Sequence, residues 1–427
     1  MVGLNRETRT EIVPELAPFS ALRFTESAGD LSLLLAPPYD VIDARGAADL
    51  KGRSEHNCVR LILPEGSPDE RYSNAAATLD RWISDGILAV DPEPAVYVYR
   101  QEFDADGRRA ERLATFAAVR LSPLDRGEVL PHERTHAGPK KDRLALTLAT
   151  GTQLSPIFMV ARDESSTLYD LERQVVAGAP VVQAVTPDGI RHSLWMVCGS
   201  HATTMLSAAS SHPLLIADGH HRYETALAAA DSLGGSVKAA YLLVCVVSQR
   251  DPGLVVRPTH RILTGPPVGA VGSFDWIGTL RETFVLDNLG PLSPAEAEER
   301  VAGEESGSFI VVPATEDDTW LAVARPEALR AAGVPSERAG IAPVVFDELI
   351  LGALYGLDAD RATRDGFLSY ARDPGSAGTV SEGGCGFILP PVSLEDVWTT
   401  AALGGRLPPK STYFEPKMPS GLLFRPL

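Results

Sequence analysis

Apolar and polar positions alternate along the chain in ways that predict both helices and strands. Helical spacing of apolar residues predicts helices over residues 72–88, 144–150, 222–233 and 345–355. Short apolar runs predict strands over residues 60–64, 95–100, 113–121, 156–160, 194–197, 213–217, 241–247 and 309–312. The strands at 95–100 and 113–121 are close enough to pair as a hairpin, and the order strand, helix, strand over 213–247 predicts a βαβ-like element. The fold class that follows is α+β, with mixed α and β elements throughout.

The length of 427 residues is too great for one ordinary core, since domains usually have ~100–200 residues. We expect an N-terminal α+β unit over residues 1–125 and a core over residues 126–265 that carries the polar motifs. Residues 266–427 then form a C-terminal α+β region that ends in a Pro-rich loop.

Composition narrows the class of protein. A net charge of −17 disfavours nucleic acid as a partner, because an acidic surface repels a phosphate backbone. The four cysteines are far apart and form no CxxC pair, which favours a reducing compartment. No signal peptide and no apolar run of ~18 residues is visible, so we expect a cytoplasmic protein without a membrane segment. No pattern indicates the oligomeric state.

The stretch from Ala217 to Arg222 carries the first candidate site. A buried strand runs into Asp218-Gly219, and a helix begins at once with His220-His221-Arg222. Free N–H groups at a helix start bind anions, whereas cations there are unfavourable unless an anion is present. This conflict indicates a phosphate site, in which Asp218 is either the helix N-cap or a Mg²⁺ ligand.

Residues 132–136 read His-Glu-Arg-Thr-His and match the HExxH zinc signature. That signature needs a continuous helix, but Pro131 precedes the segment and Gly138-Pro139 follows it. We therefore favour Glu133 as a loop carboxylate that acts as a base, near Lys140, Lys141 and Arg143. A zinc hydrolase that uses His132, Glu133 and His136 is the alternative.

Two further segments offer groups for an anionic ligand. Prolines stiffen the tail around Lys410, Ser411 and Thr412, whose side chains and backbone offer donors. A second segment, Thr259-His260-Arg261, offers a hydroxyl, an imidazole and a guanidinium. Phosphoryl transfer needs this inventory: a carboxylate for a metal, cations and N–H groups around the phosphoryl group, and a base for the acceptor hydroxyl.

These motifs, in this order, resemble the uncharacterised family DUF1015 nearly end to end: LAPPYDVI, PHERT, KKDRL, QLSPIF, ADGHHRYETA, PTHRIL and PPKSTYFEPK. That family in turn resembles the free serine kinases, which have a ParB/sulfiredoxin-like fold. The second resemblance covers roughly residues 125–265 and the tail, because the kinases lack a counterpart of the N-terminal unit. Those kinases also carry Arg-His where this chain has Tyr413-Phe414.

The resemblance implies a kinase of a small hydroxyl compound, by default free L-serine, with ADP or ATP as donor and Mg²⁺ as cofactor. It implies that Glu133 is the base and that Asp218 and His220 take part in catalysis, Asp218 also as metal ligand. The expected nucleotide-binding residues are His132, His221, Arg222, Lys410, Ser411 and Thr412. The expected substrate-binding residues are Thr259, His260 and Arg261. A ParB-like nucleotide switch that binds CTP without transfer chemistry is the other alternative.

Overall fold

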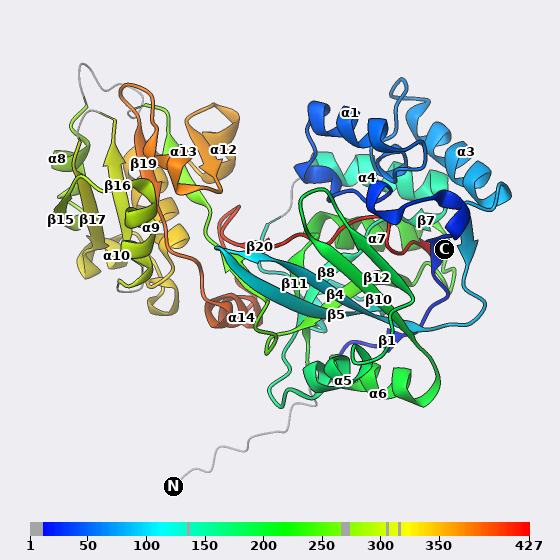
Figure 1. Cartoon of the computed structure of the whole chain (residues 1–427). Coiled ribbons are helices and arrows are strands. Elements are labelled where there is room, and N and C mark those ends of the chain that lie inside the picture. The colour runs from blue at the N-terminus through cyan, green and yellow to red at the C-terminus, as the bar shows by residue number, and fades with distance from the viewer. Residues whose placement is uncertain (1–11, 135–136, 266–273, 305–306, 315–316) are drawn as a thin grey trace, which may run out of the picture. The chain divides into compact units, whose positions relative to one another are not determined.

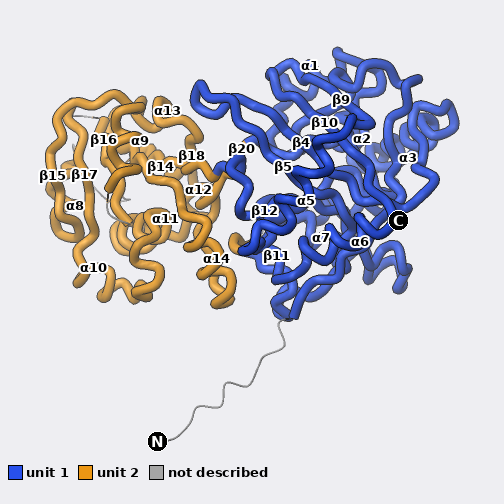
Figure 2. Tube along the Cα trace, turned by 60° about the horizontal axis from the view of Figure 1, so that its bottom comes forward, with its two compact units in different colours: residues 1–131, 135–255, 416–427 blue, residues 132–134, 256–415 orange. Residues whose placement is uncertain are grey.

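The computed structural model describes residues 12–134, 137–265, 274–304, 307–314 and 317–427. The chain divides into two compact units (Figure 2). Unit 1 holds Met1–Pro131, Thr135–Val255 and Pro416–Leu427, and unit 2 holds His132–Arg134 and Val256–Glu415. The three regions expected from the sequence are a different partition and stay a prediction.

Unit 1 is built on a nine-stranded sheet in the order β6-β11-β8-β12-β5-β4-β10-β9, with β1 paired to β5. Its strands are β1 (Leu16–Ala17), β4 (Val96–Ala105), β5 (Arg108–Arg120), β6 (Val129–Leu130), β8 (Ile157–Ala161), β9 (Val182–Val185), β10 (Arg191–Val197), β11 (Leu214–Asp218) and β12 (Tyr241–Ser248). Two small pairs join β2 (Leu22–Phe24) to β3 (Leu88–Val90) and β7 (Thr152–Gln153) to β21 (Arg425–Pro426). The predicted hairpin is confirmed as β4 and β5, which are antiparallel with Tyr97 opposite Phe116.

The helices of unit 1 are α1 (Ala44–Arg53), α2 (Val59–Ile62), α3 (Arg71–Ser84), α4 (Ala137–Thr150), α5 (Thr167–Val175), α6 (Gly199–Ala209) and α7 (His220–Ser232). In Figure 1, α5 and α6 lie side by side against the sheet, and α1, α3 and α4 gather in a separate helical layer. Single-turn 3₁₀ segments occur at η1 (Glu26–Ala28), η2 (Leu31–Leu33), η3 (Tyr39–Val41) and η4 (Leu124–Arg126). Sheet residues such as Val98 and Ile216 share a buried core with Met205 of α6 and Tyr223 of α7.

Two expectations for this unit were wrong. Residues 60–64 do not form a strand. Val59–Ile62 form the short helix α2 instead, and the side chain of Asn57 accepts a hydrogen bond from the N–H of Val59 (2.9 Å) just before it. The βαβ-like element is also absent, because β8 lies between β11 and β12. Since β11 is antiparallel and β12 parallel to β8, the two strands that flank α7 run in opposite directions.

Unit 2 contains a six-stranded sheet in the order β15-β17-β16-β19-β14-β18. Its strands are β14 (His260–Leu263), β15 (Phe284–Gly290), β16 (Phe309–Pro313), β17 (Thr319–Ala324), β18 (Leu368–Ala371) and β19 (Cys385–Ile388), and a separate pair joins β13 (Val255–Arg257) to β20 (Tyr413–Glu415). An aromatic core of Phe284, Phe309, Phe346 and Phe387 packs on this sheet.

The helices of unit 2 are α8 (Trp276–Leu280), α9 (Pro294–Ala302), α10 (Pro326–Ala331), η5 (Ser336–Arg338), α11 (Ala342–Phe346), the π-helix η6 (Asp347–Tyr355), α12 (Ala359–Arg364), α13 (Pro374–Gly378) and α14 (Leu394–Ala402). The helix predicted over 345–355 is therefore confirmed, with π geometry from Asp347 onward. Such π segments are rare and are often found at functional sites. Together the two units confirm a mixed α and β fold, whereas the ParB/sulfiredoxin-like core stays a prediction.

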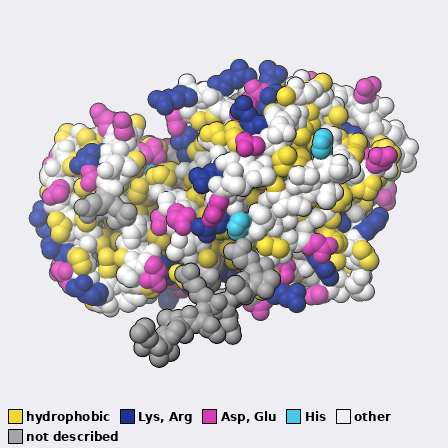
Figure 3. All heavy atoms as spheres, turned by 90° about the horizontal axis from the view of Figure 1, so that it is seen from below, with side chains coloured by type: hydrophobic (Ala, Val, Ile, Leu, Met, Phe, Trp, Pro, Cys, Tyr) yellow, Lys and Arg dark blue, Asp and Glu magenta, His cyan; other side chains and the backbone are white. Residues whose placement is uncertain are grey.

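Charged side chains of both signs are interspersed over the face shown in Figure 3. Within the ranges that the structure describes, none of the helices has the length and apolar content needed to cross a membrane.

Candidate functional site

The turn at Asp218 is shaped by Gly219. Strand β11 ends at Asp218, and α7 begins at His220. Gly219 has φ +100°, and a Cβ there would lie 3.1 Å from the guanidinium nitrogens of Arg222. Only glycine adopts this backbone without strain and leaves room for that side chain. The residue at the N-cap position is Gly219, so Asp218 is not the N-cap and its carboxylate serves another contact.

That contact is an ionic cluster inside unit 1. One oxygen of Asp218 accepts from Nη2 of Arg222 (2.5 Å), and the other accepts from Nζ of Lys417. The carboxylate is only 15% exposed. Burial by itself would raise the pKa of Asp218, but Lys417 and Arg222 hold that pKa far below its usual range, with His220 adding to the effect. Asp218 is therefore ionised at any physiological pH.

A resident magnesium ion does not fit Asp218 as it stands. Mg²⁺ is bound through carboxylate oxygens, and both oxygens of Asp218 already accept from cationic side chains, which would also repel the ion. In the part of the chain that the structure describes, no three or more His, Cys, Asp and Glu side chains are grouped to hold a metal. His136, needed for the HExxH alternative, lies outside the described residues.

Lys417 is a member of this site that the sequence reasoning left out. Its backbone carbonyl accepts from Nε2 of Gln101 (3.2 Å), and the carbonyl of Pro416 accepts from the buried Arg112, so β4 and β5 fix the backbone beside it. The sequence feature that could have identified Lys417 is the small number of lysines. The chain has six, and two of them, Lys410 and Lys417, lie in the tail.

In unit 2, the base segment (His132–Arg134) runs beside the tail loop (residues 407–412). The N–H of Leu407 donates to the carbonyl of His132 (2.7 Å), and the buried His132 shares a hydrogen bond between Nε2 and Oγ1 of Thr412 (2.9 Å). Oε1 of Glu133 accepts from the backbone N–H of Lys410 (3.2 Å). The predicted base and the predicted phosphate loop are therefore one hydrogen-bonded assembly, although some 280 residues separate them in sequence.

Arg261 holds the tail loop from within the core of unit 2. Its side chain is fully buried, and its Nη atoms donate to the carbonyls of Thr259 (2.6 Å), Lys410 (3.2 Å) and Pro409 (3.2 Å). The guanidinium also lies over the ring of Tyr370 at 4.7 Å. Burial lowers the pKa of Arg261. We call these three hydrogen bonds the Arg261 clamp; two of them hold the backbone at Pro409 and Lys410. Lys410 adopts a left-handed backbone with φ +57°, which costs a non-glycine residue about 1–2 kcal/mol.

The three residues expected to bind substrate are all buried in unit 2. Thr259 is 6% exposed, and His260 and Arg261 are 0% exposed. The ring of His260 accepts from the N–H of Leu389 at Nδ1 (3.2 Å). These contacts support a role in holding the protein backbone, so we propose a positioning role for Arg261 in place of substrate contact.

A pocket of about 230 Å³ within unit 2 borders both segments of the assembly. Arg134 lines it next to Glu133, and Pro408 and Pro409 line it just before Lys410. Asp347, the first residue of the π-helix, also lines it, and its Oδ1 is buried without a hydrogen-bond partner among the residues described. Burial raises the pKa of Asp347 to about 7, against the opposing charge of Arg261.

The structure thus assembles the predicted residues into two groups, each within its own unit. The unit 1 group contains Asp218, His220, His221 and Arg222, together with Lys417. The unit 2 group contains His132, Glu133, Lys410, Ser411 and Thr412, with Thr259, His260 and Arg261 in the core.

The chain was compared with known proteins. No curated protein matches it. Among solved structures, a variant of a free serine kinase in complex with ADP is 14% identical and covers 70% of this chain and 86% of its own, with a TM-score of 0.35. SbnI with C-terminal truncation from Staphylococcus aureus is 13% identical and covers 70% and 83%, with a TM-score of 0.34. A conserved hypothetical protein from Pyrococcus furiosus is 16% identical and covers 72% and 93%, with a TM-score of 0.30.

At such low TM-scores these likenesses do not establish a shared activity. The sequence model of one family, described as "Protein of unknown function (DUF1015)", matches residues 16–344. That match spans most of the 427 residues and includes every motif on which the resemblance was based except the tail loop. The chain belongs to the DUF1015 family.

Proposed function

We propose that this protein is a phosphotransferase that moves the terminal phosphoryl group of ADP or ATP to the hydroxyl of a small molecule, by default L-serine. The observation that carries the proposal is the assembly of Glu133 with Lys410 and of His132 with Thr412. A candidate base is held next to a loop that carries the exposed ammonium group of Lys410, a cation that suits phosphate oxygens.

In this reaction the carboxylate of Glu133 takes the proton of the acceptor hydroxyl. The hydroxyl oxygen forms a new bond to phosphorus as the bond between phosphorus and the bridging oxygen breaks, which leaves AMP from ADP or ADP from ATP. Within unit 2, the donors of the tail loop offset negative charge on the phosphates beside Glu133. Within unit 1, the cations at the start of α7 form a second group suited to an anion. A bound Mg²⁺ would supply further charge neutralisation on the phosphate oxygens.

Asp218 has a distinct role in this proposal. Its two ion pairs fix the side chains of Arg222 and Lys417 in one place, so both cations are oriented before a nucleotide arrives. The low pKa of the carboxylate keeps this arrangement intact across the neutral range.

A phosphorus NMR screen tests the proposal, with ATP and ADP against a panel of amino acids and hydroxy acids. We expect a new phosphomonoester signal with at least one acceptor. Glu133→Gln should abolish it because the amide cannot accept the proton. Asp218→Asn should reduce it because two cations lose their counter-charge. Full turnover in both variants, with intact folding, would contradict the assignment.

One contact favours a second candidate, a nucleotide-binding switch without transfer chemistry. The carboxylate of Glu133 already accepts a hydrogen bond from the backbone N–H of Lys410. This contact fits a residue that fixes the tail loop as well as it fits a catalytic base. Calorimetry with ATP, ADP and CTP separates the two candidates: the switch binds nucleotide but yields no phosphorylated product.

A further inference from the structure

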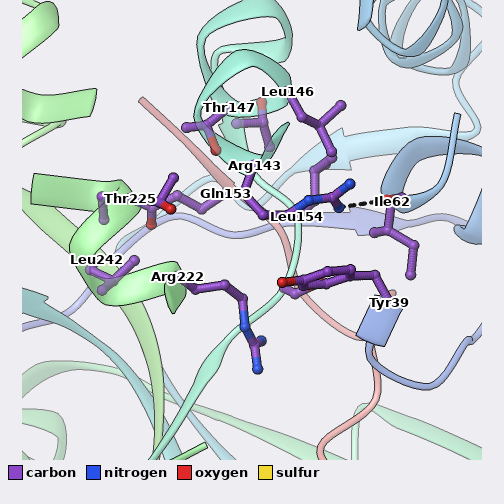
Figure 4. Close-up of a pocket in the computed structure, with 13 residues that line it drawn as sticks. Tyr39, Ile62, Arg143, Leu146, Thr147, Gln153, Leu154, Arg222, Thr225 and Leu242 are labelled. Carbon is purple, nitrogen blue, oxygen red and sulfur yellow. Dashed lines mark hydrogen bonds between the residues drawn. The ribbon is translucent and has the colours of Figure 1, made fainter. Parts of the chain in front are cut away.

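Four motifs singled out in the sequence meet at one pocket of unit 1, and the proposed chemistry uses only one of them. The pocket is lined by Tyr39 from LAPPYDVI, Arg143 from KKDRL, Gln153 and Ser155 from QLSPIF, and Arg222 from the turn at Asp218. Figure 4 shows the side chain of Arg143 over the ring of Tyr39. Arg222 extends from α7 into the same pocket. The N-terminal region thereby reaches the proposed phosphate site through Tyr39.

Tyr39 is held in place but its hydroxyl is left available. The guanidinium of Arg143 lies 4.2 Å from the centre of the Tyr39 ring, and Nη1 of Arg143 donates to the carbonyl of Ile62 (2.6 Å). In Figure 4 the hydroxyl of Tyr39 is turned toward Arg222. Within the described part of the chain, that hydroxyl makes no hydrogen bond. A fixed, half-buried donor without a protein partner is what a ligand-binding tyrosine requires.

The charges around the pocket favour an anion. Arg143 and Arg71 share the carboxylate of Asp142, and Arg222 and Lys417 share that of Asp218. Each cluster therefore carries one more cation than carboxylate, and none of the described residues that line the pocket is acidic. The positive excess attracts a negatively charged group, whereas the phenol supplies a directional hydrogen bond.

The size of the pocket limits what it takes. Its volume is about 60 Å³, and Ile62, Leu146, Leu154 and Leu242 supply apolar wall. One water needs roughly 10–15 Å³ by such a measure, so the space holds a few water molecules or a carboxylate with a short apolar stem. A nucleoside is far too large for this pocket.

We propose that this pocket is a subsite for a carboxylate-sized anionic group, with Tyr39 as its specificity-determining residue. That the group belongs to the phosphoryl acceptor rests on the proposed function. On this assignment the N-terminal region selects acceptors that carry a carboxylate, and Arg222 lies between that subsite and Asp218.

Saturation-transfer NMR tests the subsite without any catalysis. The probes are lactate, which has one carboxylate and one hydroxyl, and propane-1,2-diol, its uncharged analogue. We expect lactate to bind the full-length protein and the diol to bind at least tenfold more weakly. Tyr39→Phe removes only a hydroxyl that forms no hydrogen bond with the described residues, so folding should be unaffected, and lactate affinity should fall about tenfold or more.

Tyr169→Phe is the matched control, because Tyr169 is a half-buried tyrosine of the same unit that does not line this pocket. It should leave lactate binding unchanged. Equal binding of lactate and the diol, or equal lactate affinity in Tyr39→Phe and the wild type, overturns the subsite.

The kinetic arm separates this inference from the proposed function. If an acceptor is found, Tyr39→Phe should raise its KM about tenfold while kcat and the KM for nucleotide change little. An unchanged acceptor KM overturns the assignment to the acceptor. If no acceptor is ever phosphorylated, the proposed function fails, but the lactate result still decides the subsite.

Discussion

Replacement of Arg261 by methionine tests whether a buried guanidinium holds the tail loop. Methionine keeps an apolar stem of similar length but removes the donors to Thr259, Lys410 and Pro409. The carbonyl of Thr259 lies in a buried environment and stays unsatisfied, at a cost of about 1–3 kcal/mol. The other two carbonyls are partly accessible and regain water, so each loses about 0.5–1 kcal/mol.

The sum predicts a loss of about 2–5 kcal/mol in the free energy of unfolding of unit 2. Urea denaturation followed by tryptophan fluorescence measures it in a background with Trp82→Phe and Trp195→Phe, which leaves Trp276, Trp320 and Trp398 of unit 2 as the reporters. Under native conditions the same variant should lower kcat for phosphoryl transfer by ~10²-fold, because a shift of ~1 Å in a positioned group has that effect. Arg261→Lys keeps the charge with fewer donors, so its stability and its kcat should lie between those of the wild type and of Arg261→Met.

Arg257→Met provides the control for this argument. Arg257 pairs with Glu415 at 2.9 Å, but the two side chains are 29% and 43% exposed, so the pair contributes less than about 1 kcal/mol. If Arg261→Met and Arg257→Met unfold at the same urea concentration, the clamp has no energetic role and the reasoning is refuted.

Substitutions at three further positions test other parts of the structure. Lys410→Gly should be more stable than Lys410→Ala by about 1 kcal/mol, because glycine alone tolerates φ +57° without strain; equal midpoints in urea would contradict the left-handed backbone. Gly219→Ala should destabilise unit 1 by about 1–2 kcal/mol or more and displace Arg222, seen as a lower midpoint and weaker nucleotide binding in calorimetry. Because burial raises the pKa of Asp347 from 3.8 to about 7, the folded state binds this proton more tightly than the unfolded chain does, so stability falls as the pH rises between those values. Asp347→Asn should flatten that dependence in urea titrations, and an unchanged slope would show that Asp347 titrates normally.

Local pattern was sufficient for much of the fold. The hairpin of β4 and β5 follows from apolar alternation, and the end of α7 follows from Gly234-Gly235. Residues 59–62 show where local pattern fails, because a strand-like apolar run forms the helix α2, with all of Val59, Leu61 and Ile62 buried. The direction of β11 relative to β12 depends on β8 between them, which no local pattern contains.

Sequence reasoning likewise located some parts of the candidate site and missed others. Residue types and turn signals located the strand-to-helix turn at Asp218 and the stiff tail around Lys410. They did not identify Lys417 as the partner of Asp218, because that contact joins residues 199 positions apart. The burial of Arg261 was equally hidden, since a guanidinium among polar neighbours resembles a ligand contact until its three carbonyl partners are known.

The division of the chain between its two units has a consequence for biosynthesis. Residues 416–427 return to unit 1, where β21 pairs with β7 and Phe424 pairs with Leu22. Unit 1 is therefore incomplete on the ribosome until the whole of unit 2 has been made, and such long-range closure slows folding. A stop codon just before residue 416 would leave edge backbone of unit 1 unpaired and remove Lys417 from Asp218. We expect the nascent chain of this protein to need protection late in synthesis rather than early.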